Sequence, residues 1–83
     1  MAGTPADVAD LVKTLVLALV DEPDEVEVTY AEEGSTTVVE ISFASDDVGK
    51  VIGRQGRIIK SIRTLARAAA SYGGFDAEVE ILD

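Results

Sequence analysis

Basic residues are concentrated in one segment of this 83-residue chain. Seven bases and 16 acids give a formal net charge of −9, which by itself argues against a nucleic-acid partner. Six of the bases nevertheless lie in residues 50–67, which contain no Asp or Glu: Lys50, Arg54, Arg57, Lys60, Arg63 and Arg67. The segment therefore carries +6 and the rest of the chain −15. Such segregation is typical of an anion-binding surface, although a solvated basic helix face gives the same pattern.

The same segment contains Gly53-Arg-Gln-Gly56 between two stretches of helical periodicity. The first turn of a helix has unpaired N–H groups and the positive end of the helix dipole, so it attracts phosphate. Glycines on both sides of the turn remove side chains that would keep a sugar–phosphate backbone away, and Arg54 and Arg57 add positive charge. Ile52 and Ile59 are suited to the floor of an apolar groove for bases. We therefore predict a site that grips a single nucleic-acid strand.

The residue types needed for most enzyme chemistry are missing. The chain has no Cys and no His, which removes disulfides, thiolate zinc sites, cysteine nucleophiles and the usual general base. The acidic clusters at residues 21–25 and 46–47 are interpreted as caps and solvated turns rather than as metal sites. The loose glycine fingerprint at Gly49, Gly53 and Gly56 lacks the strand-to-helix turn of a dinucleotide site. We expect no enzymatic activity, no cofactor and no bound metal.

Hydrophobic periodicity predicts six elements in the order α-β-β-α-α-β. Thr4, Pro5 and Asp7 are typical of a helix start. The predicted elements are that helix, which ends before residue 21, strands at 26–31 and 37–44, helices at about 46–51 and 57–72, and a strand at 75–82. We expect one α+β domain over residues 1–83, with its core at about 5–82. The most apolar run, residues 11–20, is about half the length of a membrane span, so we expect a soluble, cytoplasmic protein without a targeting signal.

The apolar residues of the two long helices define the expected core and the candidate partner surfaces. In the helix at 57–72, the expected core face is Ile58, Ile62, Leu65, Ala69 and Tyr72. Lys60, Arg63 and Arg67 fall on the opposite side. Two candidate dimer surfaces are the wide apolar stripe of the first helix and the second apolar edge of this helix at Ile59, Ala66 and Ala70. The aromatic residues, Tyr30, Phe43, Tyr72 and Phe75, are interpreted as packing residues rather than as platforms for stacked bases.

Residues 50–67, KVIGRQGRIIKSIRTLAR, resemble the core of the KH domain, whose signature is (Val/Ile)-Ile-Gly-x-x-Gly-x-x-Ile. The element order is similar to that of the type II, bacterial form, which implies a three-stranded sheet with helices packed on one face. The resemblance covers nearly the whole chain and is closest to the small stand-alone bacterial KH proteins of the KhpA/YlqC group. It implies a backbone clamp at Gly53, Arg54, Gln55 and Gly56. It implies flanking contacts at Lys50, Ile52, Arg57, Ile59, Lys60 and Arg63.

The resemblance also implies a function and partners. Proteins of this group bind single-stranded RNA with low specificity, at about four nucleotides per domain. They act as RNA chaperones that influence cell elongation and division, and they form homodimers or heterodimers with a larger KH-containing protein, KhpB or Jag. Members often have a second base inside the loop, where this chain has Gln55. The alternative is a dimerisation or interaction module whose RNA binding is weak or vestigial, which the acidic body and the wide stripe of the first helix favour.

Overall fold

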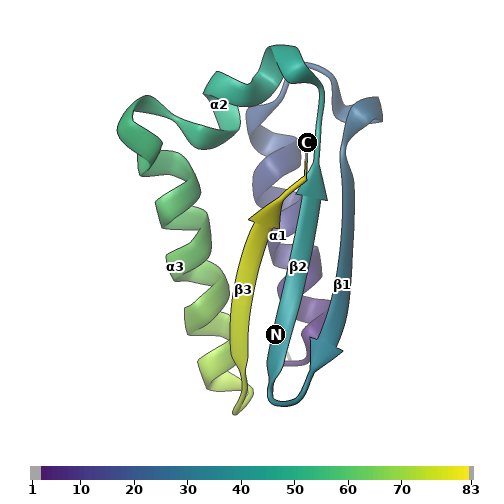
Figure 1. The fold of residues 1–83 in the computed structure, drawn as a ribbon, viewed down its shortest axis with the longest axis vertical. Helices are drawn as coiled ribbons and strands as arrows, with labels where there is room; N and C mark the ends of the chain where they lie inside the picture. The colour runs from purple at the N-terminus through teal and green to yellow at the C-terminus, as the bar shows by residue number, and fades with distance from the viewer. Residues whose placement is uncertain (1–2, 83) are drawn as a thin grey trace.

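The computed structural model describes residues 3–82 as three helices beside one three-stranded sheet (Figure 1). The helices are α1 (Pro5–Leu19), α2 (Val48–Ile52) and α3 (Arg57–Tyr72). The strands are β1 (Glu27–Glu33), β2 (Thr36–Ser42) and β3 (Asp76–Ile81). Short 3₁₀ turns lie at Pro23–Glu25, Ser45–Asp47 and Arg54–Gly56. The predicted α+β class and element order are thereby confirmed, and within residues 3–82 no helix is both long and apolar enough to cross a membrane.

Helix α1 begins where the sequence predicts. The Thr4 hydroxyl accepts a hydrogen bond from the Asp7 N–H at 3.2 Å, and the Asp7 carboxylate accepts one from the Thr4 N–H at 3.2 Å. This reciprocal pair satisfies two N–H groups that a helix start leaves without partners. Pro5 occupies the first helical position, where its missing N–H removes no hydrogen bond.

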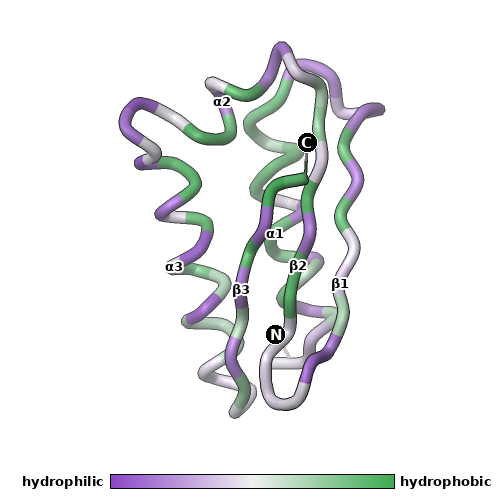
Figure 2. The backbone as a smooth tube through the Cα atoms, viewed as in Figure 1, coloured by the Kyte–Doolittle hydropathy of each residue, from purple (hydrophilic) through white to green (hydrophobic). Residues whose placement is uncertain are grey.

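The sheet has the order β1-β2-β3, with β1 antiparallel to β2 and β2 parallel to β3. Because two parallel neighbours need a crossover connection, the chain between β2 and β3 leaves the sheet and forms both α2 and α3. The register places Val39 opposite Tyr30 on one side and Val79 on the other. The crossover is thus what carries the glycine loop, which Figure 2 shows as a hydrophilic turn at the edge of the molecule.

The core lies between the sheet and α1 and α3. Val8, Val12 and Val16 of α1 are fully buried, as are Val39 and Ile41 of β2. Phe43, just beyond the end of β2, is partly buried against the same core. In the wide apolar stripe of α1, Val16 belongs to the core, whereas the large side chain of Leu17 is exposed.

The predicted core face of α3 is wrong by part of a turn. The buried residues are Ile59, Ile62, Ala66 and Ala70. Leu65 is 48% exposed and Tyr72 is 82% exposed, so neither is a core residue. Tyr30 of β1, also predicted to be a packing residue, is 44% exposed. The edge at Ile59, Ala66 and Ala70 therefore cannot serve as a dimer surface. Both stripes fit a period of 3.6 residues, and packing of α3 against β3 selects the one that contains the small alanines.

Candidate nucleic-acid interface

A buried carboxylate fixes α2 against the end of α1. Asp47, only 1% exposed, accepts hydrogen bonds from the backbone N–H groups of Asp21 and Glu22, both at 3.2 Å. Lys50 lies on the next turn, with its Nζ 3.0 Å from Asp21 Oδ2 and 3.8 Å from Asp47 Oδ1. The pattern at residues 46–47 predicts a cap or a solvated turn. Asp47 does stand at the N-cap position of α2, but its side chain is buried rather than solvated. No local pattern reveals the role, because the N–H partners lie some 25 residues earlier in the chain.

The ammonium group of Lys50 is therefore paired with acidic side chains of its own chain. The hydrogen bond and the charge of Asp21 raise the pKa of Lys50 above its ordinary value of 10.5. Desolvation opposes this rise, and the charges of Asp47 and Asp46 add smaller increases. The ammonium group, predicted to flank the RNA clamp, is directed by these contacts toward the end of α1.

The Gly-x-x-Gly loop is built from left-handed backbone. Gly53 has φ 79° and ψ 172°, a combination that is essentially restricted to glycine. Gly56 has φ 72°, and Gln55 between them has φ 58°, the only positive φ of a non-glycine residue in the described chain. A Cβ atom on Gly53 would lie 2.6 Å from Ile58 Cγ1, whereas one on Gly56 would meet nothing closer than 4.0 Å. Gly53 is thus required by space and conformation, and Gly56 by conformation alone.

Gln55 positions an arginine within the loop. Its Oε1 accepts a hydrogen bond from Arg57 Nη2 at 3.1 Å. The contact joins the third loop position, where a second base was expected from the family pattern, to the first residue of α3. The arginine beside the helix start is therefore held by the loop that it follows.

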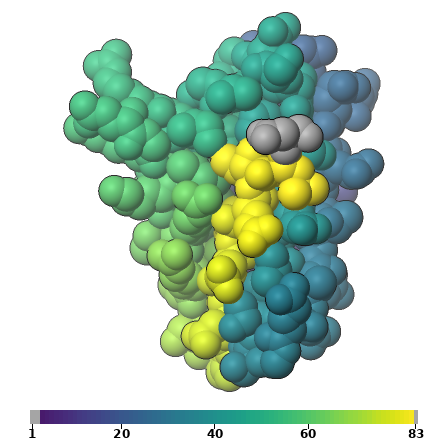
Figure 3. Space-filling view, viewed as in Figure 1, coloured from purple at the N-terminus to yellow at the C-terminus, as the bar shows by residue number. Residues whose placement is uncertain are grey.

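Most of the positive charge of residues 50–67 is not neutralised by acidic side chains within residues 3–82. In the part of the protein that the structure describes, Lys50 is the one base of this segment that forms an ion pair. Arg63 donates its Nε–H to the carbonyl of Val79 on β3 at 3.1 Å, which places its guanidinium along the outer edge of the sheet. Arg54 and Lys60 are exposed. Figure 3 shows the α2–α3 segment projecting from the body at the upper left.

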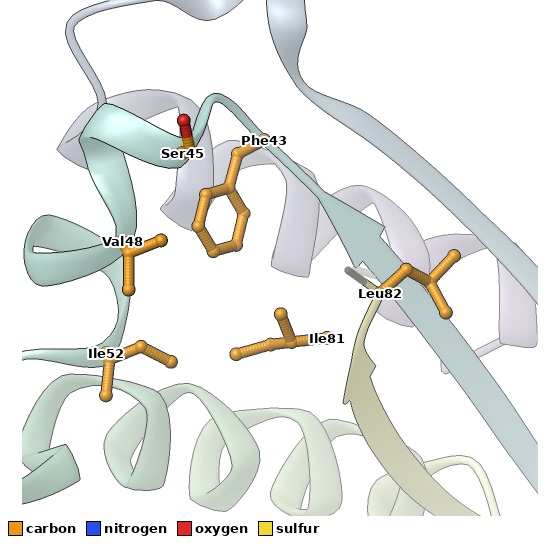
Figure 4. Close-up of a pocket in the computed structure, with 6 residues that line it drawn as sticks. All are labelled: Phe43, Ser45, Val48, Ile52, Ile81 and Leu82. Carbon is orange, nitrogen blue, oxygen red and sulfur yellow. The ribbon is translucent and has the colours of Figure 1, made fainter.

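An apolar hollow of about 510 Å³ lies beside this loop (Figure 4). Its described lining is Phe43, Ser45, Val48, Ile52, Ile81 and Leu82. Ile52, predicted as groove floor, lines it and immediately precedes Gly53. Ile59 does not line it, because its side chain is 5% exposed and belongs to the core. Phe43 and Ile81 take its place in the lining. Alternation along the strands is the only signal for them in the sequence, and it does not indicate a groove.

The arrangement combines an apolar floor, a loop of open backbone and unpaired cations. Such a combination can hold the flat faces of bases and the charged backbone of one strand at the same time. Between residues 3 and 82, no group of three or more acidic side chains is disposed to hold a metal ion.

Comparison with known proteins identifies this arrangement. The sequence profile described as KhpA/KhpB, KH domain, matches residues 9–81. The chain belongs to the KhpA/KhpB KH-domain family. This confirms the resemblance recognised from residues 50–67, and it confirms the KH fold. Relatives of the KhpA/KhpB family are named as RNA-binding proteins rather than as enzymes, in agreement with the predicted absence of enzymatic activity.

Two relatives and one solved structure define the similarity. The RNA-binding protein KhpA of Caldanaerobacter subterraneus subsp. tengcongensis is 52% identical over 61 residues, which cover 74% of this chain and 81% of that protein. The RNA-binding protein KhpA of Borreliella burgdorferi is 42% identical over 74 residues, which cover 89% and 90%. The crystal structure of Era in complex with MgGDPNP and nucleotides 1506–1542 of 16S ribosomal RNA matches with a TM-score of 0.61 at 22% identity. That match covers 89% of this chain but 28% of Era, and it supports the fold alone.

Proposed function

We propose that this chain binds single-stranded RNA, with phosphates at residues 53–56 and bases in the hollow beside them. The observation that carries the proposal is the continuity of the two surfaces: Ile52 lines the hollow, and Gly53, the next residue, opens the loop. RNA that is single-stranded can turn its bases into an apolar groove while its backbone follows a positively charged edge. The name RNA-binding protein, which the KhpA relatives carry, supports the same function.

The residues of the site take distinct roles in this proposal. Gly53 and Gly56 allow close approach of the backbone, while Arg54, Arg57 and Lys60 supply charge. Arg63 contributes at the sheet edge. Lys50 makes no direct contact with RNA in this proposal, since Asp21 holds its ammonium group, and Ile59 supports the loop from the core. Residues 5–82 would act together as one KH domain.

A loop variant with a charge-matched control tests the proposal. Substitution R54D/Q55D changes the net charge by −3 and places a carboxylate at each central loop position. Asp is among the residues that tolerate positive φ, so position 55 can keep its backbone conformation. The control K13D/T14D makes the same charge change on the exposed side of α1. We expect R54D/Q55D to abolish binding of a fluorescent single-stranded RNA while the control retains it. Equal affinities of both variants would reject the proposal.

We further propose that the chain works in the cytoplasm as an RNA chaperone or post-transcriptional regulator together with a second KH chain. The partner would be a second copy or a larger protein of the KhpB/Jag type, which the description of the family supports. A second apolar hollow, of about 360 Å³, lies between α1 and α3 and includes Leu15, Leu19 and the exposed Leu65. Sedimentation of the wild type and of L65E tests pairing through this surface. A monomeric wild type at micromolar concentration would reject the homodimer.

A further inference from the structure

The aromatic ring of Phe43 borders the hollow beside the glycine loop. Phe43 follows β2, and its side chain is only partly buried against the core. Figure 4 shows the ring among Val48, Ile52 and Ile81, at the border of the open centre of the hollow and with α1 behind it. From the sequence alone, Phe43 is expected to be a packing residue. The structure adds a second contact surface, because part of the ring is open to whatever enters the hollow.

The rest of the lining offers little that could distinguish one base from another by hydrogen bonds. Among the described lining residues, Ser45 alone has a side chain with a hydrogen-bonding group. The others are aliphatic, apart from Phe43. A ring among aliphatic side chains recognises a flat, polarisable ligand, and every nucleobase has such a face.

We infer that Phe43 is the stacking residue of this groove, and that it makes the site prefer purines to pyrimidines at one nucleotide position. The inference rests on the proposed function, since it concerns the bases of the same RNA strand. Stacking on an aromatic side chain strengthens with the area and polarisability of the base, and both are larger for a purine than for a pyrimidine. Modest base preferences in single-strand sites arise from stacking strength in this way. Phe43 would thus determine specificity through the ring face rather than through base edges.

The other phenylalanine provides a matched control. The chain contains two Phe and no Trp. Phe75 is also partly buried against the core, but it lies between α3 and the start of β3, at the end of the sheet away from the glycine loop (Figure 1). Equivalent substitutions at the two positions therefore disturb the core in a similar way, while only one of them changes the hollow.

Fluorescence of a single introduced indole tests the inference directly. In F43W the hollow leaves room for the larger ring, and a stacked base should quench its emission when oligoadenylate is added. F75W should show no change at the same RNA saturation. In parallel, F43L should weaken binding of oligoadenylate by about 5- to 20-fold, toward the lower end of what loss of one stacked base causes, and should weaken binding of oligouridylate less. F75L should leave both affinities within about twofold of the wild type.

Two results would overturn the inference while the proposed function stands. One is that F43W binds RNA without a change of indole emission, although R54D/Q55D abolishes RNA binding. The other is an F43L variant whose affinities for both oligonucleotides equal those of F75L. A wild-type chain that binds neither oligonucleotide would instead reject the proposed function itself.

Discussion

The side chain of Ile58 occupies the space that a Cβ atom on Gly53 would need, with Cγ1 2.6 Å from that position. Ile58 is the second residue of α3, and Gly53 is the C-cap residue that follows α2. The sharp reversal between the two helices is therefore closed by a packing contact as well as by backbone conformation. Gly53 and Gly56 look equivalent in the sequence, but only Gly53 has a neighbour that leaves no room for a side chain.

We predict that G53A destabilises the fold more than G56A does. Gly56 has an ordinary left-handed conformation, which costs an L-residue about 1–2 kcal/mol. An alanine at position 53 would adopt a conformation that costs about 1–3 kcal/mol, and its Cβ atom would also clash with Ile58. Chemical denaturation of both variants measures the difference. The double variant G53A/I58A removes the close approaches of Cγ1 and Cδ1 and keeps both the backbone strain and the 2.9 Å approach of Cβ at position 58. If I58A and G53A have additive effects, the approaches of Cγ1 and Cδ1 contribute nothing.

We predict that D47A costs about 2–4 kcal/mol in the free energy of unfolding. The substitution leaves the N–H groups of Asp21 and Glu22 without their acceptor in a part-buried position, and lost partners of buried donors cost about 1–3 kcal/mol each. The neighbouring Asp46 is exposed, so D46A should stay within about 0.5 kcal/mol of the wild type. Urea denaturation of the two variants provides the measurement. Equal midpoints would show that the Asp47 contacts do not stabilise α2.

The sequence predicted the fold better than it predicted which faces are buried. The range 57–72 of α3 agrees with the structure, because Gly56 and Gly73 bound it and no proline or glycine interrupts it. The choice between its two apolar stripes was wrong, since it depends on how closely α3 approaches β3. The hairpin was predicted from alternation, with its strands displaced by one or two residues at their ends.

The candidate site was predicted in its charges and its loop but not in its floor. The bases and glycines of residues 50–67 lie in a single stretch, so their grouping requires no tertiary information. The floor joins residues from the end of β2, from α2 and from the end of β3, and this grouping depends on the crossover. The pairing of Lys50 with Asp21 has the same origin, because it joins α2 to the end of α1.

We predict that Lys50 loses its proton only at a pH above its ordinary range. Because the folded-state pKa is raised above 10.5 by Asp21, the pairing stabilises the fold fully below that pH. The stabilisation is lost as the pH rises through the raised pKa. The ¹³Cε resonance of Lys50 reports the titration. D21N should lower its midpoint, while E22Q, which removes a neighbouring charge without removing the hydrogen bond, should change it less. Equal midpoints in wild type and D21N would contradict the pairing in solution.

We predict that RNA affinity falls with salt and that the bases of residues 50–67 contribute unequally to this dependence. Three phosphate contacts, from Arg54, Arg57 and Lys60, would give a slope of about −2 in a plot of log affinity against log salt concentration, since each contact to a single strand contributes about −0.7. K60Q should therefore reduce the slope by about 0.7. K50Q should leave it nearly unchanged, because Asp21 already neutralises that ammonium group.

The two variants, K50Q and K60Q, remove the same charge ten residues apart, so a change in net charge alone would affect them equally. Titrations of labelled single-stranded RNA at four salt concentrations distinguish these outcomes. Equal slopes for K50Q and K60Q would mean that RNA binding depends on the general field of the segment rather than on contacts at the start of α3.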